Sequence, residues 1–293
     1  MTNKRDFLKL LGAGVLGAAG IRALAPEAAS RGGATASEDV FERILKDGIL
    51  RAAYIVYPPY FVKDLNTGAL SGLYYDMTMK LAADFGVKVE WVEEVSFSTP
   101  FEGLYTNRYD IVAANIWPNG SRARRADFTR PVCYNGFNVY LRPDQTHRFK
   151  TLQDLNRSDV RLALVEGEGF VPIAQEICPK ANFLFLPNSV SNAELVLQLM
   201  THKADATFLE FAFANNFLRE HPNAIAPLMQ DPLQVYPCGF SIARHQPSFR
   251  SLLDTLVETM VNTGFVEGLL KKYESASGDF IRVAKPYQSM AFS

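Results

Sequence analysis

The chain has 293 residues, of which 30 are Lys or Arg and 31 are Asp or Glu, so its formal net charge is −1. This balance gives no electrostatic reason to expect nucleic acid or an anionic membrane as a partner. The four histidines lack metal-ligand spacing, and the chain has neither a phosphate-binding loop nor a Gly-x-Ser-x-Gly motif, so a metal site, a cofactor or a hydrolase has little support.

Residues 1–36 have the pattern of an export signal. Lys4-Arg5-Asp6-Phe7-Leu8-Lys9 resembles a twin-arginine motif with Lys in place of the first Arg. The apolar stretch at 10–21 is shorter than the roughly 20 residues that a membrane span needs. Cleavage after Ala36 removes five basic and two acidic residues, leaving 25 against 29 and a net charge of −4. We therefore expect a periplasmic protein that is exported by the twin-arginine route.

Strands and helices alternate along the remaining chain, which predicts an α/β fold with mostly parallel sheets. Strands are expected at 51–56, 87–92, 111–114, 161–165, 182–186 and 206–209. Helices are expected at 76–85, within 100–107, and at 152–155, 170–177, 192–201, 249–262 and 266–273. The pattern starts again after the first three strands, which favours two sheets over one.

The alternation also divides the mature chain into two lobes. Lobe 1 is predicted to comprise 37–132 and 240–293, and lobe 2 to comprise 137–236. The connecting segments, near 131–136 and 236–240, each contain glycine beside apolar or aromatic residues. This composition suits a segment that must pair as a strand and also bend, so both are hinge candidates.

Arg122 follows an apolar run that begins after Asp110 and ends in a Pro-Asn-Gly turn. Such a run is typical of a parallel strand buried on both faces, and ligands bind beyond the carboxyl ends of these strands. A guanidinium there is able to clamp a carboxylate with two parallel hydrogen bonds. The alternative is a solvent-exposed arginine in a basic turn, which is what we expect for Arg124 and Arg125.

The segment around Arg122 resembles the Thr-x-x-Arg…Asp-Phe-Ser stretch of the periplasmic amino-acid-binding proteins, the family 3 solute receptors of ABC importers. The resemblance begins at 49–54, passes through 57–60, 68–72 and Asp76, and continues to about Tyr273. It implies the type 2 periplasmic-binding fold, in which two lobes, each a mostly parallel sheet flanked by helices, are joined by two hinge strands. The C-terminal helices are then expected to return to lobe 1.

The resemblance also implies a ligand site. Arg122 matches the arginine that holds the α-carboxylate of the ligand, and Glu210 matches the acidic residue that receives its α-ammonium group. Phe97 and Tyr57 match aromatic positions that flank the ligand. Each residue has a structural alternative, since Phe97 also suits a core, Tyr57 a brace for the Pro-Pro turn, and Glu210 a solvated strand end.

Three residues depart from the family pattern. Asn119 replaces Thr but keeps a donor and an acceptor, and Trp117 is large enough for a pocket wall or for ordinary packing. Glu168 lies where the family commonly has Thr or Ser, and where the N-terminal amides of the helix after Gly169 help to bind a carboxylate. Glu168 either turns away to cap that helix or recognises a cation, which favours a basic amino acid or a polyamine-like compound as ligand.

These expectations describe a monomeric periplasmic receptor that closes on a small amine-bearing solute and delivers it to the membrane permease of an ABC importer. A dehydratase-like enzyme acting on a small carboxylic acid is an alternative, because some relatives of this fold act in this way and Glu168 beside Arg122 is chemically suited to be a general acid. A sensory or accessory protein that presents a ligand is a third possibility, which the sequence does not separate from the first.

Three cysteines in an oxidising compartment permit one internal disulfide. Cys133 and Cys238 fall in the two hinge segments, which are expected to be adjacent and antiparallel. We therefore predict a Cys133–Cys238 bridge. The alternative is that all three cysteines are small buried apolar residues.

Overall fold

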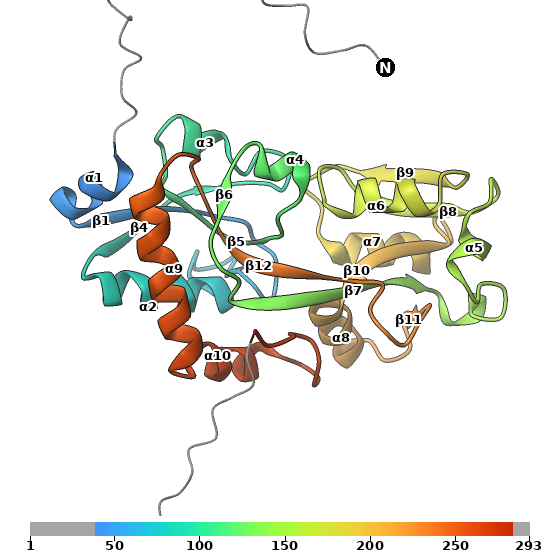
Figure 1. Cartoon of the computed structure of the whole chain (residues 1–293). Coiled ribbons are helices and arrows are strands. Elements are labelled where there is room, and N and C mark those ends of the chain that lie inside the picture. The colour runs from blue at the N-terminus through green and yellow to red at the C-terminus, as the bar shows by residue number, and fades with distance from the viewer. Residues whose placement is uncertain (1–38, 284–293) are drawn as a thin grey trace, which may run out of the picture. The chain divides into compact units, whose positions relative to one another are not determined.

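The computed structural model describes residues 39–283 of the chain, so the predicted export signal at 1–36 lies outside the described residues. Helices and strands alternate, as predicted for an α/β fold (Figure 1). The helices are α1 (Val40–Asp47), α2 (Leu73–Phe85), α3 (Glu102–Tyr105), α4 (Gly120–Ala123), α5 (Leu152–Leu155), α6 (Phe170–Ile177), α7 (Asn192–Met200), α8 (Phe211–Glu220), α9 (Pro247–Asn262) and α10 (Phe265–Tyr273), with a 3-10 turn at Pro143–Gln145. The strands are β1 (Ile49–Tyr54), β2 (Val62–Lys63), β3 (Leu70–Ser71), β4 (Lys88–Glu94), β5 (Ile111–Ile116), β6 (Asp127–Phe128), β7 (Cys133–Leu141), β8 (Arg161–Val165), β9 (Asn182–Leu186), β10 (Ala206–Glu210), β11 (Ala226–Pro227) and β12 (Gln234–Ile242).

Eight of these strands form one hydrogen-bonded path, in the order β4-β1-β5-β12-β7-β10-β8-β9. The pairs β1–β4, β1–β5, β8–β9 and β8–β10 are parallel, whereas β12 is antiparallel to both β5 and β7. The prediction of two sheets is therefore modified. Strand β12 is long enough to pair with β7 through residues 234–238 and with β5 through 239–242, so it joins the two halves into one path.

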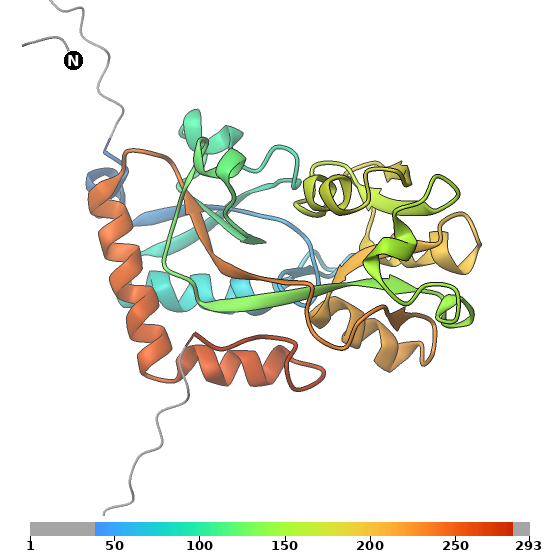
Figure 2. The same cartoon turned by 45° about the vertical axis from the view of Figure 1, so that its right-hand side comes forward.

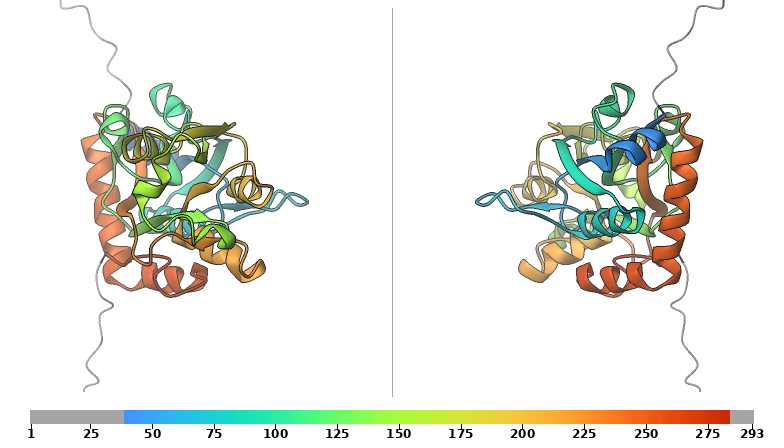
Figure 3. Two further views of the ribbon diagram at one scale, coloured as in Figure 1. Left: turned by 90° about the vertical axis from the view of Figure 1, so that its right-hand side faces the viewer. Right: turned by 90° about the vertical axis from the view of Figure 1, so that its left-hand side faces the viewer.

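We call the half that contains β4, β1 and β5 lobe 1. Its core includes Leu50 of β1, Met77 of α2 and Val112 of β5, together with Leu253 and Leu270 from the C-terminal helices, and all of these are buried. Helices α9 and α10 contact each other and α2, and they lie beside it in all the ribbon views (Figures 1, 2 and 3). The expected return of the C-terminal helices to lobe 1 is thus confirmed.

We call the half that contains β7 to β11 lobe 2. Two separate apolar clusters support its sheet. One contains Phe137, Leu162 and Phe208 with α6, and the other contains Ala163, Leu195 and Leu209 with α7 and α8. Because alternate residues of a strand point to opposite faces, the sheet is buried on both sides, as the apolar sequence of β8 and β10 requires.

Most element boundaries agree with the pattern of the sequence. Helices α5 and α6 and strands β8 and β9 have the predicted bounds, and α2 ends at Gly86, whose φ of 78° is left-handed. Helix α2 begins three residues before Asp76, because its first amides donate to the carbonyls of Pro59 and Tyr60 instead of to a side-chain cap. Asp76 instead binds Lys272 of α10, at 2.7 Å.

The two predicted hinge segments lie side by side in β7 and β12, which pair antiparallel with Asn135 opposite Tyr236 and Cys133 opposite Cys238. Their predicted adjacency is confirmed, while the lobe boundaries and the hinge motion stay predictions. Among residues 39–283, no helix combines the length and the apolar character that crossing a bilayer requires.

Candidate ligand-binding site

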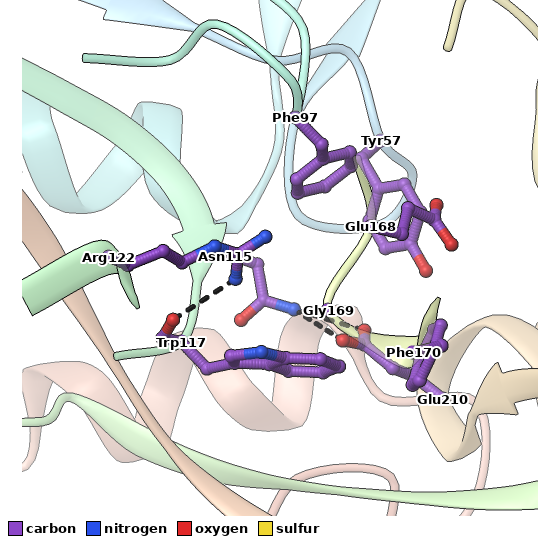
Figure 4. A pocket seen from close by; sticks show the side chains of 9 residues that line it. All are labelled: Tyr57, Phe97, Asn115, Trp117, Arg122, Glu168, Gly169, Phe170 and Glu210. Atoms are coloured by element: carbon purple, nitrogen blue, oxygen red, sulfur yellow. Dashed lines mark hydrogen bonds between the residues drawn. The ribbon is translucent and has the colours of Figure 1, made fainter. Parts of the chain in front are cut away.

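A small cavity lies where the two lobes meet, and residues of both lobes line it (Figure 4). Lobe 1 contributes Tyr57, Phe97, Asn115, Trp117 and Arg122, and lobe 2 contributes Glu168, Gly169, Phe170 and Glu210. The sequence had pointed to all of these except Asn115 and Phe170. The cavity has a volume of about 20 Å³, which is room for one or two water-sized groups.

Arg122 reaches the cavity from helix α4, directly after the buried strand β5. Asn119 caps α4 by accepting a hydrogen bond from the backbone N–H of Arg122 at 2.9 Å, so Asn119 supports the arginine but does not line the cavity. The Arg122 guanidinium donates to the Trp117 carbonyl oxygen at 3.1 Å. No carboxylate of the described residues lies within ion-pair distance of it. Arg124 and Arg125 are exposed, as expected.

Burial of the Arg122 guanidinium lowers its pKa to about 10, although the nearby acids Glu168 and Glu210 oppose the change. A cation that is desolvated in this way and lacks an anionic partner has a high free energy. The side chain is therefore suited to a ligand that brings a carboxylate to it.

Glu210 ends strand β10 and is only 3 % exposed, so it is not the solvated strand end that we had considered. Its two carboxylate oxygens each accept a hydrogen bond from Asn115 Nδ2, both at 3.0 Å. Burial raises the pKa of Glu210 to about 7, and Tyr60, Asn115 and Arg122 oppose this rise. The Tyr60 hydroxyl lowers the pKa of Glu210 by lying close to its carboxylate, although it makes no hydrogen bond with the described residues.

Asn115 is the polar site residue that the sequence interpretation missed. It is the last residue but one of β5, where it is 4 % exposed, and its Oδ1 accepts a hydrogen bond from Asn135 Nδ2 of β7 at 3.0 Å. Asn135, Asn115 and Glu210 therefore form a buried chain of hydrogen bonds from one predicted hinge strand, through lobe 1, to lobe 2. An asparagine inside an otherwise apolar strand was the available signal, because a buried amide needs partners.

Glu168 is buried and lines the same cavity. It does not cap α6, because Gly169 is the N-cap residue and no side chain caps this helix. Burial, reinforced by Glu210 and opposed by Arg122, raises the pKa of Glu168 to about 8. Figure 4 shows its carboxylate beside the Tyr57 ring, across the cavity from Arg122.

Aromatic rings form the walls of the cavity. Tyr57 and Phe97 meet edge to face at 5.5 Å between centroids, and Tyr57 Oη accepts a hydrogen bond from Asn192 Nδ2 of lobe 2 at 2.6 Å. The Trp117 ring lies 3.7 Å from the Tyr236 ring, between their centroids, so it serves both as a wall and in packing. It crosses the α6 N-terminus so closely that a Cβ added to Gly169 would lie 2.2 Å from it.

All three cysteines are buried thiols in the structure, with Cys133 and Cys238 directly opposite each other on β7 and β12. The predicted bridge between them stays a prediction. In the part of the chain that the structure describes, no group of three or more His, Cys, Asp or Glu residues is placed to hold a metal ion.

The fold and the interlobe cavity define a class of two-lobed binding proteins, and comparison with known sequences specifies the family. The family of bacterial extracellular solute-binding proteins, family 3, matches residues 50–276, and the chain belongs to it. The structural neighbours of the chain are amino-acid-binding periplasmic proteins of the type 2 fold.

Three relatives are informative. Cyclohexadienyl dehydratase of Pseudomonas aeruginosa is 25% identical over 232 residues, which cover 79% of this chain and 84% of the relative. A probable amino-acid ABC transporter-binding protein of Haemophilus influenzae is 22% identical over 71% of this chain and 77% of its own. The third is an ancestral protein known from solved structures.

One structure of this ancestral protein, described as an amino acid-binding precursor of cyclohexadienyl dehydratase, has a TM-score of 0.72 at 26% identity and covers 80% of this chain and 99% of that one. Another, described as a cationic amino acid solute-binding protein, has a TM-score of 0.63 at 27% identity and covers 80% and 98%.

Proposed function

We propose that this protein is a periplasmic receptor for an amino acid with a cationic side chain, which it presents to an ABC importer. One observation carries this proposal. Arg122 of lobe 1 and Glu210 of lobe 2 line one cavity, and neither forms an ion pair with any described residue although both are largely desolvated. A zwitterion supplies both missing charges at once.

The amino acid would bind with its α-carboxylate on Arg122 and its α-ammonium group on Glu210. A guanidinium and a carboxylate can form two parallel charge-assisted hydrogen bonds, and a carboxylate that accepts two bonds from Asn115 still has lone pairs for an ammonium. Tyr57 and Phe97 would exclude water from these contacts, which strengthens them.

Glu168 decides the class of side chain. The cavity contains two carboxylates and one guanidinium, so a neutral amino acid leaves one acid without a partner, whereas a cationic side chain balances it. Burial raises the pKa of Glu168 to about 8, and a cationic group placed beside it would lower this pKa and bind the ionised carboxylate. The description of the ancestral relative as a cationic amino acid solute-binding protein supports the same choice.

Binding would be coupled to closure of the lobes about β7 and β12. In the structure, hydrogen bonds cross between the lobes from Asn192 to Tyr57 and from Asn188 to Ser98. Because the cavity has room for only one or two water-sized groups, the lobes would part to admit an amino acid and then close over it. The closed form would present both lobes to a permease in one arrangement, which suits delivery of the solute to an importer. The receptor would act as a monomer and would be exported through the twin-arginine route.

Titration calorimetry with L-lysine, L-arginine, L-leucine and L-glutamate tests the proposal. We expect the two cationic amino acids to bind and Arg122→Ala to weaken their binding by roughly 2–5 kcal/mol, the usual effect of removing one partner of a buried charged contact. Arg124→Ala, which changes an exposed arginine two residues away, is the matched control and should bind normally. Tight binding of glutamate without binding of lysine or arginine would contradict the proposal.

A second candidate is a dehydratase, because Glu168 would be largely protonated at neutral pH and one relative is cyclohexadienyl dehydratase. Arg122 would hold the substrate carboxylate, and Glu168 would protonate a hydroxyl group, which leaves as water. A neighbouring C–H bond would break at the same time, with its electrons forming the new double bond and its proton passing to Glu210. Turnover of cyclic hydroxy acids by the wild-type chain, lost in Glu168→Gln, would favour this candidate. Absence of turnover together with binding of lysine would favour the receptor.

A further inference from the structure

A second and much larger hollow adjoins the cavity. This outer groove has a volume of about 780 Å³ and is bordered by both lobes. Tyr57, Phe97 and Glu168 line both the cavity and the groove, so the two spaces share a wall at these side chains. A solute held by Arg122 and Glu210 would therefore have its free end directed past Glu168 into the groove.

The charged side chains that line the groove are nearly all acidic. They are Glu93, Glu94, Glu168 and Glu220, and the described lining residues include His221 but no Lys or Arg. Glu93 and Glu94 are ion-paired, with Arg108 at 3.0 Å and Lys63 at 2.7 Å.

Glu220 differs from these two, because it forms no ion pair with the described residues. Its neighbour Arg219 instead donates to Asn216 Oδ1, at 2.7 Å. Glu220 therefore contributes a negative charge without a partner among the described residues to the lining of the groove. Glu168 contributes a carboxyl group where the groove meets the cavity, and a bound cation would favour its ionised form.

Aromatic rings line the same groove. Helix α8 and its C-cap residue His221 place three neighbouring rings in the groove, those of Phe213, Phe217 and His221. Their centroids are 6.0 Å apart for the first two rings and 4.6 Å for the last two. Phe97 lines the groove from lobe 1. A groove lined by both acids and aromatic rings is complementary to a flexible apolar chain that carries positive charge, because ring faces attract cations and also cover methylene groups.

We infer that the preferred solute is a cationic amino acid with a long tail, whose terminal charge lies farther from the α-carbon than in lysine or arginine. Its zwitterionic head binds Arg122 and Glu210, its chain passes Glu168 and the aromatic rings, and its terminal cation reaches Glu220. This inference rests on the proposed function and specifies the substrate class of the same site.

Calorimetry with three probes tests the inference: L-lysine, Nε-(L-lysyl)-L-lysine, which has a longer and more highly charged tail, and Nε-acetyl-L-lysine, whose tail is neutral. We expect the lysyl-lysine compound to bind at least tenfold more tightly than lysine, and the acetylated compound more weakly than lysine. Glu220→Gln should weaken lysyl-lysine binding several-fold and leave lysine binding unchanged, because only the long tail reaches Glu220.

Glu176→Gln is the matched control, since Glu176 is exposed on α6 outside the groove, and it should bind both probes normally. The effect of Glu220→Gln should shrink in 1 M salt, where charges are screened beyond about 3 Å. Equal affinity for lysine and lysyl-lysine, or equal losses for both in Glu220→Gln, would overturn the inference but leave the proposed function intact. Failure of all three probes to bind would instead count against the proposed function.

Discussion

Asn115 determines how Glu210 is available to a ligand. Its amide donates to both carboxylate oxygens and is itself fixed by Asn135, so it stabilises the ionised form of Glu210 inside a desolvated cavity. The Asn115 N–H groups bind the same carboxylate that is expected to receive the ammonium group of a solute. Under the proposed function, Asn115 would thus be a positioning residue that tunes the affinity for amines.

Replacing Asn115 by Ala should raise the pKa of Glu210 further and weaken L-lysine binding at pH 7 by about 1.5–3 kcal/mol, the range for a hydrogen bond to a charged group. Part of the loss should be recovered at pH 9, where Glu210 is again ionised. Titration calorimetry at both pH values measures this, with exposed Asn66→Ala as control. A loss that is the same at both pH values would mean that Asn115 acts only through the fold.

At the residue scale, the sequence predicted the charged residues of the site but not Asn115, the polar residue that hydrogen-bonds to Glu210. Arg122 and Glu168 follow strand ends and Glu210 is the last residue of its strand, so all three lie where side chains reach the ligand edge of an α/β sheet and their positions are visible in the pattern. Asn115 lies within a strand, and its role depends on Asn135 and Glu210, which are brought to it only by the pairing of β12 with β5 and β7.

At the scale of elements, the α6 N-terminus and Trp117 form one packing unit. Gly169 permits the Trp117 ring to pass directly over the start of the helix. We expect Gly169→Ala to lower the free energy of unfolding by roughly 1–3 kcal/mol, the usual cost of overpacking, and to weaken L-lysine binding because Trp117 and Glu168 are displaced.

Gly120→Ala is the matched control, since a Cβ at Gly120 meets no atom within 4 Å and the residue is exposed in α4. Urea unfolding of both variants measures the difference. A Gly169→Ala protein with the stability and affinity of the wild type would show that Trp117 is not confined as described.

Local pattern specifies most of the elements, because apolar periodicity and turn residues act over a few positions. Helix α6 and strand β8 illustrate this. The features that the local pattern did not predict depend on contacts between residues that are distant in the sequence. The start of α2 is set by carbonyls of Pro59 and Tyr60, and the joining of two predicted sheets is set by the length of β12.

At the scale of the whole molecule, the two buried carboxyls link ligand binding and folding to pH. Both have pKa values raised above 4.5, to about 7 for Glu210 and about 8 for Glu168, so the folded chain holds protons that the unfolded chain loses. Their contribution to stability is therefore present at low pH and is lost as the pH rises from about 4.5 to about 8.

A cationic solute favours the ionised carboxyls, so its binding should release protons between pH 6 and 8 and tighten as the pH rises through this window. Tyr57, Tyr60, Tyr236 and Arg122 also face these carboxyls, but their pKa values lie above this range. Calorimetry of L-lysine binding in two buffers of different ionisation enthalpy counts the protons, and Glu168→Gln should release fewer. Proton uptake on binding would contradict the assigned roles of the two acids.

The most direct test of the account is the identity of the solute that the protein itself selects. Freshly purified, exported protein can be denatured, and the small molecules that it releases can be identified by mass spectrometry. We predict a compound with an α-amino acid head and at least one further amine or guanidinium group. Consistent recovery of a carboxylic acid without nitrogen would contradict the claim that Arg122 and Glu210 hold the two ends of a zwitterion.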